Sequence, residues 1–222
     1  MTNFLVYEFN SLPSTHTFSK ENIKLYSGDT LIIAKQQTSG IGRRGGEWIS
    51  PLGNFYGSFI LKSADFIDEK NLSHLSFIVA VGVAIYFKSF DFNDFSFKWP
   101  NDIFNIEMTH KIGGILIEKI DSSYILSIGI NLVSVPSESL SSASYSFLSL
   151  SDLNADTLLE NWSNQNLFQN ILNLLDSYKE QGFEDIQKRW MQKCGHINQF
   201  ITLSNGLSGV FKGIDHTGAP IF

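Results

Sequence analysis

A segment rich in glycine and arginine contains the residues best suited to binding an anionic ligand. It runs from Gln37 to Trp48 and includes Gly40, Gly42, Arg43 and Arg44. Glycine lets a ligand approach the main chain closely, and arginine presents a planar fork of donors that fits phosphate or carboxylate. The segment therefore predicts a loop that closes over an anion, although an exposed turn without a ligand would have the same composition. No Gly-Lys-Ser/Thr follows at the required spacing, so it is not a P-loop.

A second group of polar residues follows a short strand pattern that begins at Phe95. The sequence Lys-Trp-Pro-Asn-Asp places Lys98, Asn101 and Asp102 together, and Pro100 ends the strand. A lysine, an amide and a carboxylate presented at the end of a strand are typical of a polar site on a rigid scaffold. A plain turn explains this segment equally well when it is considered alone.

A third group lies in the next predicted strand and in its partner. Lys111 opens a strand that contains Gly113 and Gly114, and glycines inside a strand mark a bulge or the close approach of a ligand or backbone. The apolar run 124–132 is its expected antiparallel partner, and it contains a polar amide, Asn131. A buried amide needs a hydrogen-bond partner, which a backbone group could supply.

A turn rich in hydroxyl groups lies near the N-terminus. It spans residues 11–17 and contains Ser14, Thr15 and His16. Serine and threonine at such a position favour the start of a helix, because their side chains accept a hydrogen bond from the first free N–H groups. On these residues alone, a helix cap is the favoured interpretation of Ser14 and Thr15.

The remaining pattern predicts the elements that position these groups. Alternating or continuous apolar runs predict strands, and longer apolar runs with capping residues predict helices. Asp68 or Asn71 is a candidate cap for the long apolar helix, whose His74 is interpreted as structural, and Asn205-Gly206 indicates a hairpin. The expected strands are 4–9, 30–34, 54–61, 95–99, 111–118 and 124–132, the expected helices are 72–89, 156–181 and 183–193, and short β segments follow residue 196.

The composition excludes several classes of protein. With 222 residues, 43% hydrophobic and 17% charged, the chain is expected to form a soluble domain with a small appendage. A net charge of −6 argues against general nucleic-acid binding, and a single cysteine, Cys194, excludes an internal disulfide. No His/Cys cluster has zinc-ligand spacing, and we find neither a signal peptide nor an apolar run of membrane-spanning length. We therefore expect a cytoplasmic location.

In this order, the three groups and the hydroxyl-rich turn resemble the biotin–protein ligase (biotin–[acetyl-CoA-carboxylase] ligase) family. The likeness covers about residues 4 to 215. It implies an α+β fold, a mixed β-sheet flanked by helices of the class II synthetase-like type, with a short SH3-like β tail. It further implies a catalytic domain at 1–195 and a C-terminal β segment at 196–222, existing as a monomer or homodimer.

The resemblance also implies a reaction and its participants. Biotin attacks the α-phosphate of ATP, accompanied by Mg²⁺, to give biotinyl-5′-AMP, and a lysine of the biotin carboxyl carrier protein then attacks this adenylate. The implied catalytic residues are Arg43, Lys98, Asp102 and Lys111, and the implied nucleotide contacts are Asn101 and Asn131. The implied biotin and adenylate contacts are Ser14, Thr15, His16, Gln37, Gly40, Gly42, Arg43, Arg44, Trp48, Lys111, Gly113 and Gly114.

Departures from the family pattern refine these expectations. Ile41 and Gly46 stand where the family loop has arginines, and His16 stands where its Ser-Thr-Asn turn has asparagine. We expect looser retention of the adenylate than in an arginine-complete loop. No helix-turn-helix pattern precedes the first strand, so operator binding is not expected. The alternatives are a lipoate or octanoate ligase of the same fold, which would lack the Lys-Trp-Pro-Asn-Asp segment, and a non-catalytic biotin-binding regulatory module.

Overall fold

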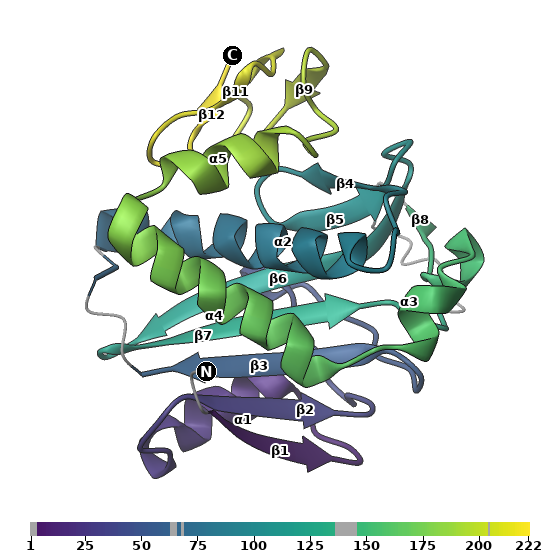
Figure 1. The fold of residues 1–222 in the computed structure, drawn as a ribbon, viewed down its shortest axis with the longest axis vertical. Coiled ribbons are helices and arrows are strands. Elements are labelled where there is room, and N and C mark those ends of the chain that lie inside the picture. The colour runs from purple at the N-terminus through teal and green to yellow at the C-terminus, as the bar shows by residue number, and fades with distance from the viewer. Residues whose placement is uncertain (1–3, 63–65, 68, 136–145, 204) are drawn as a thin grey trace.

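A mixed β-sheet is the centre of the fold. The structure is a computed structural model, and it describes residues 4–62, 66–67, 69–135, 146–203 and 205–222. Eight strands form the main sheet in the order β1-β2-β3-β7-β6-β5-β4, with β8 pairing with β6 (Figure 1). The β1–β2 and β6–β8 pairs are parallel and the other pairs are antiparallel. The predicted α+β class with a mixed sheet is confirmed.

The strands of this sheet and the helices packed on it have well-defined limits. The strands are β1 (Leu5–Phe9), β2 (Thr30–Ala34), β3 (Phe55–Leu61), β4 (Phe95–Lys98), β5 (Asp102–Asn105), β6 (His110–Ile120), β7 (Ser123–Ile130) and β8 (Ser146–Phe147). The α-helices are α1 (Thr15–Asn22), α2 (Leu72–Lys88), α3 (Asp156–Glu160), α4 (Asn164–Gln181) and α5 (Glu184–Met191), and the 3-10 turns are η1 (Ile23–Leu25), η2 (Arg43–Gly45), η3 (Glu69–Asn71) and η4 (Ser151–Leu153). The sequence pattern missed β5 and β8, which are only four and two residues long.

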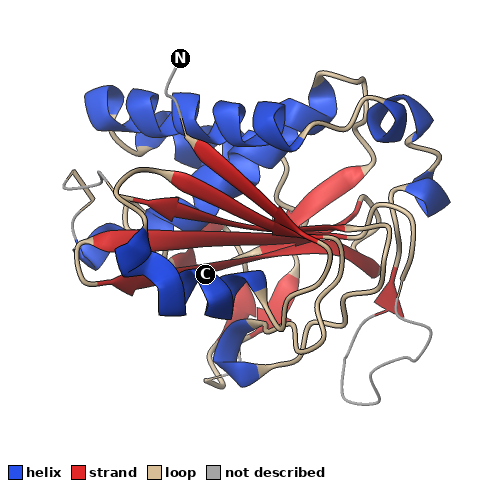
Figure 2. Cartoon of the chain, turned by 90° about the horizontal axis from the view of Figure 1, so that it is seen from below, coloured by secondary structure: helices blue, strands red, loops and turns tan. Residues whose placement is uncertain are grey.

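Both faces of the sheet are covered, and the alternation of side chains along its strands assigns each face (Figure 2). In β2, Leu31 and Ile33 belong to the large core under α2 and α4, whereas Ile32 and Ala34 belong to a small core with Ile23. Successive side chains of a strand point to opposite faces, so a strand buried on both faces is a continuous apolar run. The helix α1 packs over the second face, against β2, β3 and β7.

The helix α2 is buried through most of its length. Its bounds match the predicted helix within one residue, and Asn71 precedes it without a side-chain cap hydrogen bond, while Asp68 lies outside the described residues. By length and composition, the segment Glu69–Lys88 is also apolar enough to cross a membrane, contrary to the sequence expectation. In this fold 67% of that window is buried inside the protein, as in the core helix of a soluble domain.

The predicted helix 156–181 is divided into two. The helix α3 ends at Glu160, and α4 begins after Ser163, whose side chain accepts a hydrogen bond from the backbone N–H of Asn166. By capping the start of α4, Ser163 favours a new helix over the continuation of α3. At the end of α4, Gly182 adopts φ +79° and its N–H bonds to the Tyr178 carbonyl, as predicted for a glycine C-cap.

The C-terminal segment forms two small antiparallel pairs at the end of the molecule opposite β1 (Figure 1). They are β9 (Phe200–Thr202) with β10 (Ser208–Val210), joined through the predicted Asn205-Gly206 turn, and β11 (Gly213–Ile214) with β12 (Pro220–Ile221). Phe211 and Ile214 belong to the large core of the domain. An SH3-like arrangement is not confirmed, because the two pairs do not join into one sheet.

His74 connects this C-terminal segment to the helical layer. Its Nε2 donates to the backbone oxygen of His216 at 2.9 Å, and its Nδ1 accepts from the Tyr178 hydroxyl at 2.8 Å. The ring stacks on Phe183 with centroids 3.7 Å apart. These contacts satisfy a neutral imidazole completely, in keeping with the structural role expected for His74.

We expect the free energy of unfolding to decrease as the pH is lowered, and His74 to account for part of this decrease. Burial lowers the pKa of His74 from its ordinary value of 6.5. The unfolded chain therefore binds a proton more readily, so the stabilisation is complete above pH 6.5 and is lost as the pH falls below it. Urea unfolding of His74→Gln should show a smaller fall in stability between pH 7.5 and 5.5 than the unmodified protein. An equal fall would assign the effect to the buried His16 and the half-buried His196, whose pKa values burial also lowers.

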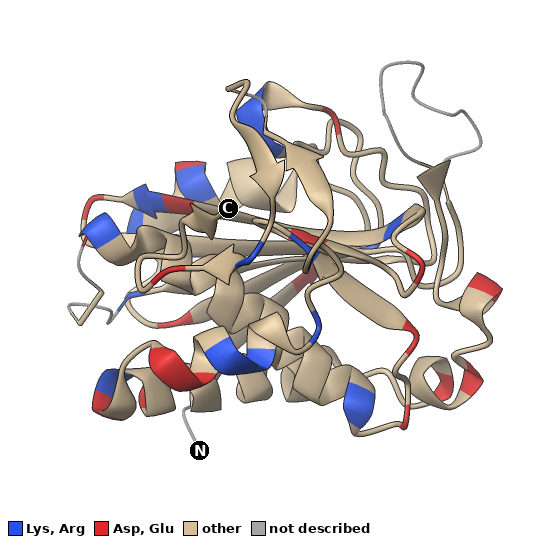
Figure 3. Ribbon diagram, turned by 90° about the horizontal axis from the view of Figure 1, so that it is seen from above, with Lys and Arg blue, Asp and Glu red and all other residues tan. Residues whose placement is uncertain are grey.

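Acidic and basic residues are both spread along the chain. Figure 3 shows Lys and Arg interspersed with Asp and Glu along the ribbon, and no side of the molecule in that view carries Lys and Arg alone. Nucleic acids are bound chiefly through clustered Lys and Arg. The distribution agrees with the acidic net charge of −6.

Candidate active site

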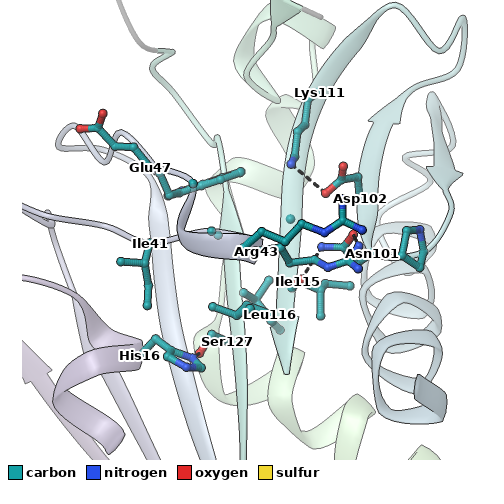
Figure 4. A pocket seen from close by; sticks show the side chains of 18 of the residues that line it. His16, Ile41, Arg43, Glu47, Asn101, Asp102, Lys111, Ile115, Leu116 and Ser127 are labelled. Carbon is teal, nitrogen blue, oxygen red and sulfur yellow. Dashed lines mark hydrogen bonds and ion pairs between the residues drawn. The ribbon is translucent and has the colours of Figure 1, made fainter. Parts of the chain in front are cut away.

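A cavity of about 600 Å³ lies on the α1 face of the sheet (Figure 4). It collects side chains from α1, the Gln37–Trp48 segment, the β4–β5 turn, β6, β7 and the C-terminal segment. Of the predicted site residues, it is lined by Ser14, Thr15, His16, Gln37, Gly42, Arg43, Arg44, Trp48, Lys98, Asn101, Asp102, Lys111 and Gly114. The fold therefore brings all four sequence groups together, although they span residues 14 to 114.

Lys111 and Asp102 form an ion pair inside this cavity. The Lys111 Nζ lies 2.7 Å from Asp102 Oδ1, and both side chains are largely shielded from water (Figure 4). Lys111 faces the cavity because β6 contains a bulge: Ile103 pairs with Gly113 and Phe104 pairs with Lys111, which leaves Ile112 without a partner in β5. An extra residue re-aims the side chains before it. The bulge thus places Lys111 on the same face as Gly114. A bulge was one of the two interpretations that the strand glycines allowed.

Arg43 extends from the glycine-rich loop to the opposite wall. Its Nη1 donates to Asn101 Oδ1 at 2.7 Å, and Asn101 Nδ2 donates to the Ile115 carbonyl at 2.7 Å. Burial lowers the pKa of Arg43, with a further lowering from Arg44, but a guanidinium remains charged at any physiological pH. This bond holds the Arg43 cation beside Asn101, so that Arg43 and Lys111 both lie near the Asp102 carboxylate (Figure 4).

Lys98 adds a third cation on the β4 side. It lies 4.7 Å from the centroid of the Phe104 ring, and burial lowers its pKa, while Asp102 raises it. Arg43, Lys98 and Lys111 therefore all line one cavity beside Asp102. Such a group of fixed cations neutralises phosphate charge at low cost in reorganisation, since the donors are already in place.

The other end of the cavity is polar and uncharged. The Ser14 side chain accepts from the Thr17 N–H, so the predicted helix cap is confirmed, and Ser14 and Thr15 are only 2% and 3% exposed. Gln37 Oε1 accepts from the Thr15 backbone N–H at 2.8 Å. Hydroxyl and amide groups held this way can recognise a neutral group that both donates and accepts hydrogen bonds.

Trp48 forms part of the floor between the two ends. A side chain on Gly129 would meet the indole ring at 2.7 Å, and one on Gly114 would meet it at 3.2 Å. The ring also lies 5.0 Å from the Lys111 Nζ, and its Nε1 is buried and has no hydrogen-bond partner among the residues that the structure describes. These two glycines are required by the close approach of the indole to the sheet.

Three predicted site residues lie outside the cavity lining. Gly113 packs against the Gly129 carbonyl, which a side chain on residue 113 would meet at 2.9 Å. Asn131 is 1% exposed, and its Nδ2 donates to the Leu148 carbonyl at 3.2 Å, so backbone satisfies this amide. Gly40 lies behind the loop, where its carbonyl accepts from the Trp48 N–H at 2.8 Å. Their contacts support the wall of the cavity.

Gly40→Ala should disturb the loop that carries Gln37 and Trp48, although Gly40 itself lies outside the cavity lining. A Cβ at residue 40 would lie 2.3 Å from the Trp48 carbonyl and 2.9 Å from Gln37 Nε2, so the loop must move. Overpacking of this kind costs about 1–3 kcal/mol. We expect a lower melting temperature and weaker ligand binding in calorimetry. Gly28→Ala is the matched control, because nothing lies within 4 Å of that position, and equal behaviour of the two variants would contradict the prediction.

The structure adds residues that the sequence pattern did not indicate. Ser58 and Ser127 are cross-strand partners in β3 and β7, and their Oγ atoms are 2.7 Å apart. Each is a serine between apolar residues in the interior of its strand, which is the signal that could have found them. Thr202, Leu203 and Asn205 of the C-terminal segment also line the cavity, together with Ile41, Gly46 and Glu47 of the loop.

Two other chemistries receive no support from the described part of the chain. It contains no group of three or more His, Cys, Asp or Glu side chains arranged to hold a metal ion. Burial raises the pKa of the Cys194 thiol to about 11, so this cysteine is protonated at neutral pH. A thiol must lose its proton to act as a nucleophile. Cys194 is therefore not a candidate nucleophile.

Comparisons with known proteins agree on one family. The chain is 28% identical to the biotin–[acetyl-CoA-carboxylase] ligase of Paracoccus denitrificans, over 95% of this chain and 92% of the relative. It is 26% identical to the biotin–protein ligase of Schizosaccharomyces pombe, over 90% of this chain but 36% of that protein. The biotin protein ligase of Aquifex aeolicus in complex with biotin and ATP has a similar structure, with a TM-score of 0.81, 26% identity, and coverage of 97% of this chain and 90% of that one.

The sequence profile of one family covers more than half of the chain. The match spans residues 8–133, which contain α1, the glycine-rich loop and the strands that carry Lys98, Asp102 and Lys111. These are the residues that the fold gathers around the cavity. The chain belongs to the biotin/lipoate A/B protein ligase family.

Proposed function

We propose that this protein is an ATP-dependent biotin–protein ligase. The observation that carries the proposal is one cavity with three cations and a carboxylate at one end and buried hydroxyl groups with a half-buried amide at the other. Biotin has a carboxylate at the end of an apolar chain and a cyclic urea at the other end, which matches this polarity. The likeness to ligases named for biotin supports the same substrate.

The first step would join biotin to the nucleotide. A biotin carboxylate oxygen attacks the α-phosphorus of ATP, a P–O bond forms, and pyrophosphate leaves with the electrons of the broken P–O bond. Arg43, Lys98 and Lys111 would stabilise negative charge on the phosphate and carboxylate oxygens as it redistributes. Mg²⁺ would arrive with ATP through the phosphate oxygens, because the described chain offers no three-ligand metal group of its own.

The second step would transfer biotin to a protein. A lysine amine of the biotin carboxyl carrier protein attacks the acyl carbon, a C–N bond forms, and the bond from the acyl carbon to the phosphate oxygen breaks, its electrons leaving with AMP. Asp102 would accept or orient the proton that the amine loses. The loop of Gly42, Arg43 and Arg44 would cover the adenylate and exclude water until the acceptor arrives. Ile41 and Gly46 supply no cation there, so we expect faster loss of the adenylate than from an arginine-complete loop.

Two assays test the proposal. Biotin-dependent exchange of pyrophosphate into ATP reports the first step, and transfer of labelled biotin to a carrier-protein domain reports the second. We expect both activities. Binding of biotin without pyrophosphate exchange would point to a regulatory module. Exchange that depends on lipoate or octanoate and not on biotin would mean that biotin is not the substrate.

A further inference from the structure

A short turn of the C-terminal segment is bound to two other parts of the domain. This C-terminal turn, residues 215–219, joins β11 to β12, and three successive carbonyl groups in it accept hydrogen bonds from side chains outside the segment. The donor and acceptor pairs are His74 Nε2 with His216 at 2.9 Å, Ser73 Oγ with Thr217 at 2.6 Å, and Trp99 Nε1 with Gly218 at 3.0 Å. The first two donors belong to α2, whereas Trp99 belongs to the β4–β5 turn, residues 99–101. The C-terminal turn therefore connects the β4–β5 turn to α2.

The C-terminal turn is held in one conformation by Asp215 and by its packing. Asp215 Oδ1 accepts from the backbone N–H groups of Thr217 and Ala219 at 2.8 and 3.0 Å, and from the Thr217 hydroxyl at 2.7 Å. A carboxylate that accepts local N–H groups in this way fixes the turn around it. Gly218 is buried with φ +82°, and a Cβ there would meet the Phe77 ring at 2.4 Å. The Gly218 carbonyl is thus an acceptor with a fixed position.

The β4–β5 turn determines where the charged groups of the cavity lie. Lys98 and Asp102 stand at its two ends and are paired across β4 and β5. Asn101 Nδ2 donates to the Ile115 carbonyl at 2.7 Å, and the Ile115 N–H donates to the Asn101 carbonyl at 2.9 Å. These bonds attach the β4–β5 turn to β6. The Trp99 indole N–H gives it a second attachment, to the C-terminal turn.

We infer that Trp99 is a positioning residue, whose indole N–H holds the β4–β5 turn so that Lys98 and Asp102 keep their places beside Lys111. The inference rests on the proposed function, in which these three charged groups act on the reacting atoms. Displacement of such a group by about 1 Å can reduce a rate by about 10²-fold. The neutral end of the cavity is formed by α1 and Gln37, away from this turn. Loss of the Trp99 bond should therefore affect the chemical step more than the binding of biotin.

Trp99→Phe tests this role because it removes the indole N–H and keeps an aromatic ring in the cavity wall, which Trp99 also lines. We expect the kcat of biotin-dependent pyrophosphate exchange to fall by about 10–100-fold, with little change in the KM for biotin. Trp162→Phe is the matched control, since Trp162 Nε1 donates to Asn164 Oδ1 at 2.7 Å in the helical layer, and its kcat should be unchanged. A kcat of Trp99→Phe equal to that of the unmodified protein or of Trp162→Phe would overturn the inference.

A second substitution tests whether Trp99 acts through the C-terminal turn. Asp215→Ala releases the conformation of that turn, and Asp215 is not one of the residues that line the cavity. It should lower kcat as Trp99→Phe does, and the double variant should be no slower than the slower single variant, because both substitutions break one link. Full additivity of the two losses would mean that Trp99 acts independently of the C-terminal turn, and would overturn the inference.

Hydrogen exchange of the indole N–H measures the link without any substrate. In the full chain with isotope-labelled tryptophan, the signal that disappears in Trp99→Phe identifies Trp99 among the four tryptophans. Its N–H should exchange slowly with deuterium, and Asp215→Ala should accelerate this exchange by about tenfold or more without affecting Trp162. Exchange as fast as that of an exposed indole in the unmodified protein would overturn the inference alone. A protected Trp99 N–H in a protein without biotin-dependent pyrophosphate exchange would instead overturn the proposed function, and the role of Trp99 in that reaction with it.

Discussion

Lys111→Ala should reduce biotin-dependent pyrophosphate exchange by about 10²–10³-fold or more, the loss typical when one fixed donor to a developing charge is removed. Lys111 is 7% exposed, its ammonium is held 2.7 Å from Asp102, and it lies in the cavity that also contains Arg43 and Lys98. In such a shielded site a charge acts more strongly than in water. Transfer to the carrier protein should fall with exchange, because no adenylate would form to supply it.

Controls are needed because removal of Lys111 leaves Asp102 without its ion-pair partner. A largely buried, unpaired charge is destabilising, so Lys111→Ala could lose activity by unfolding. Lys111→Gln keeps a hydrogen-bond donor for Asp102 without the positive charge, and it should fold normally yet show the same loss. Lys119→Ala removes a lysine from the far end of the same strand, and its activity should be unchanged. If a folded Lys111→Gln variant kept a rate of pyrophosphate exchange within tenfold of the unmodified protein, Lys111 would not be a catalytic residue.

Local pattern predicted most of the elements because each depends on a short stretch of sequence. The observed bounds of β2 equal the predicted ones, those of α2 differ from the predicted ones by one residue, and Ser14 caps α1 as expected. Gly182 ends α4 for the reason that the sequence indicated. The short strands β5 and β8 were missed, since two to four residues present too little periodicity to distinguish from a turn.

The site was harder to predict because it depends on register. Gly113 and Gly114 indicated a bulge, but only the pairing of Phe104 with Lys111 shows that the extra residue turns Lys111 into the cavity. Ser58 and Ser127 become neighbours through the pairing of two strands that are far apart in sequence. Asn131 illustrates the reverse case: a lone buried amide looks functional in the sequence, yet it binds the Leu148 carbonyl.

Asp102→Asn should separate the two steps of the proposed reaction. The first step consumes a carboxylate and needs no base, whereas the second needs a proton removed from an ammonium. Glu47 and Asp102 are the carboxylates among the described residues that line the cavity, and only Asp102 contacts Lys111 there. General base catalysis contributes about 10²–10⁴-fold. We therefore expect transfer to a carrier domain to fall by that order, while pyrophosphate exchange falls much less.

The pH dependence of transfer distinguishes a base from a structural partner of Lys111. In Asp102→Asn the amine must lose its proton to solvent, so single-turnover transfer from preformed adenylate should rise steadily between pH 7 and 9 and approach the unmodified rate at high pH. Glu47→Gln is the matched control, since it removes the other cavity carboxylate and should leave both steps and their pH profiles unchanged. Equal losses in exchange and transfer, with an unaltered pH profile, would instead mean that Asp102 acts only by holding Lys111 in place. The 2.7 Å ion pair between Lys111 and Asp102 exists before any ligand binds. Asp102 would therefore have to leave Lys111 when the acceptor amine arrives. This change of partner would keep Asp102 from acting as a base before the acceptor is present.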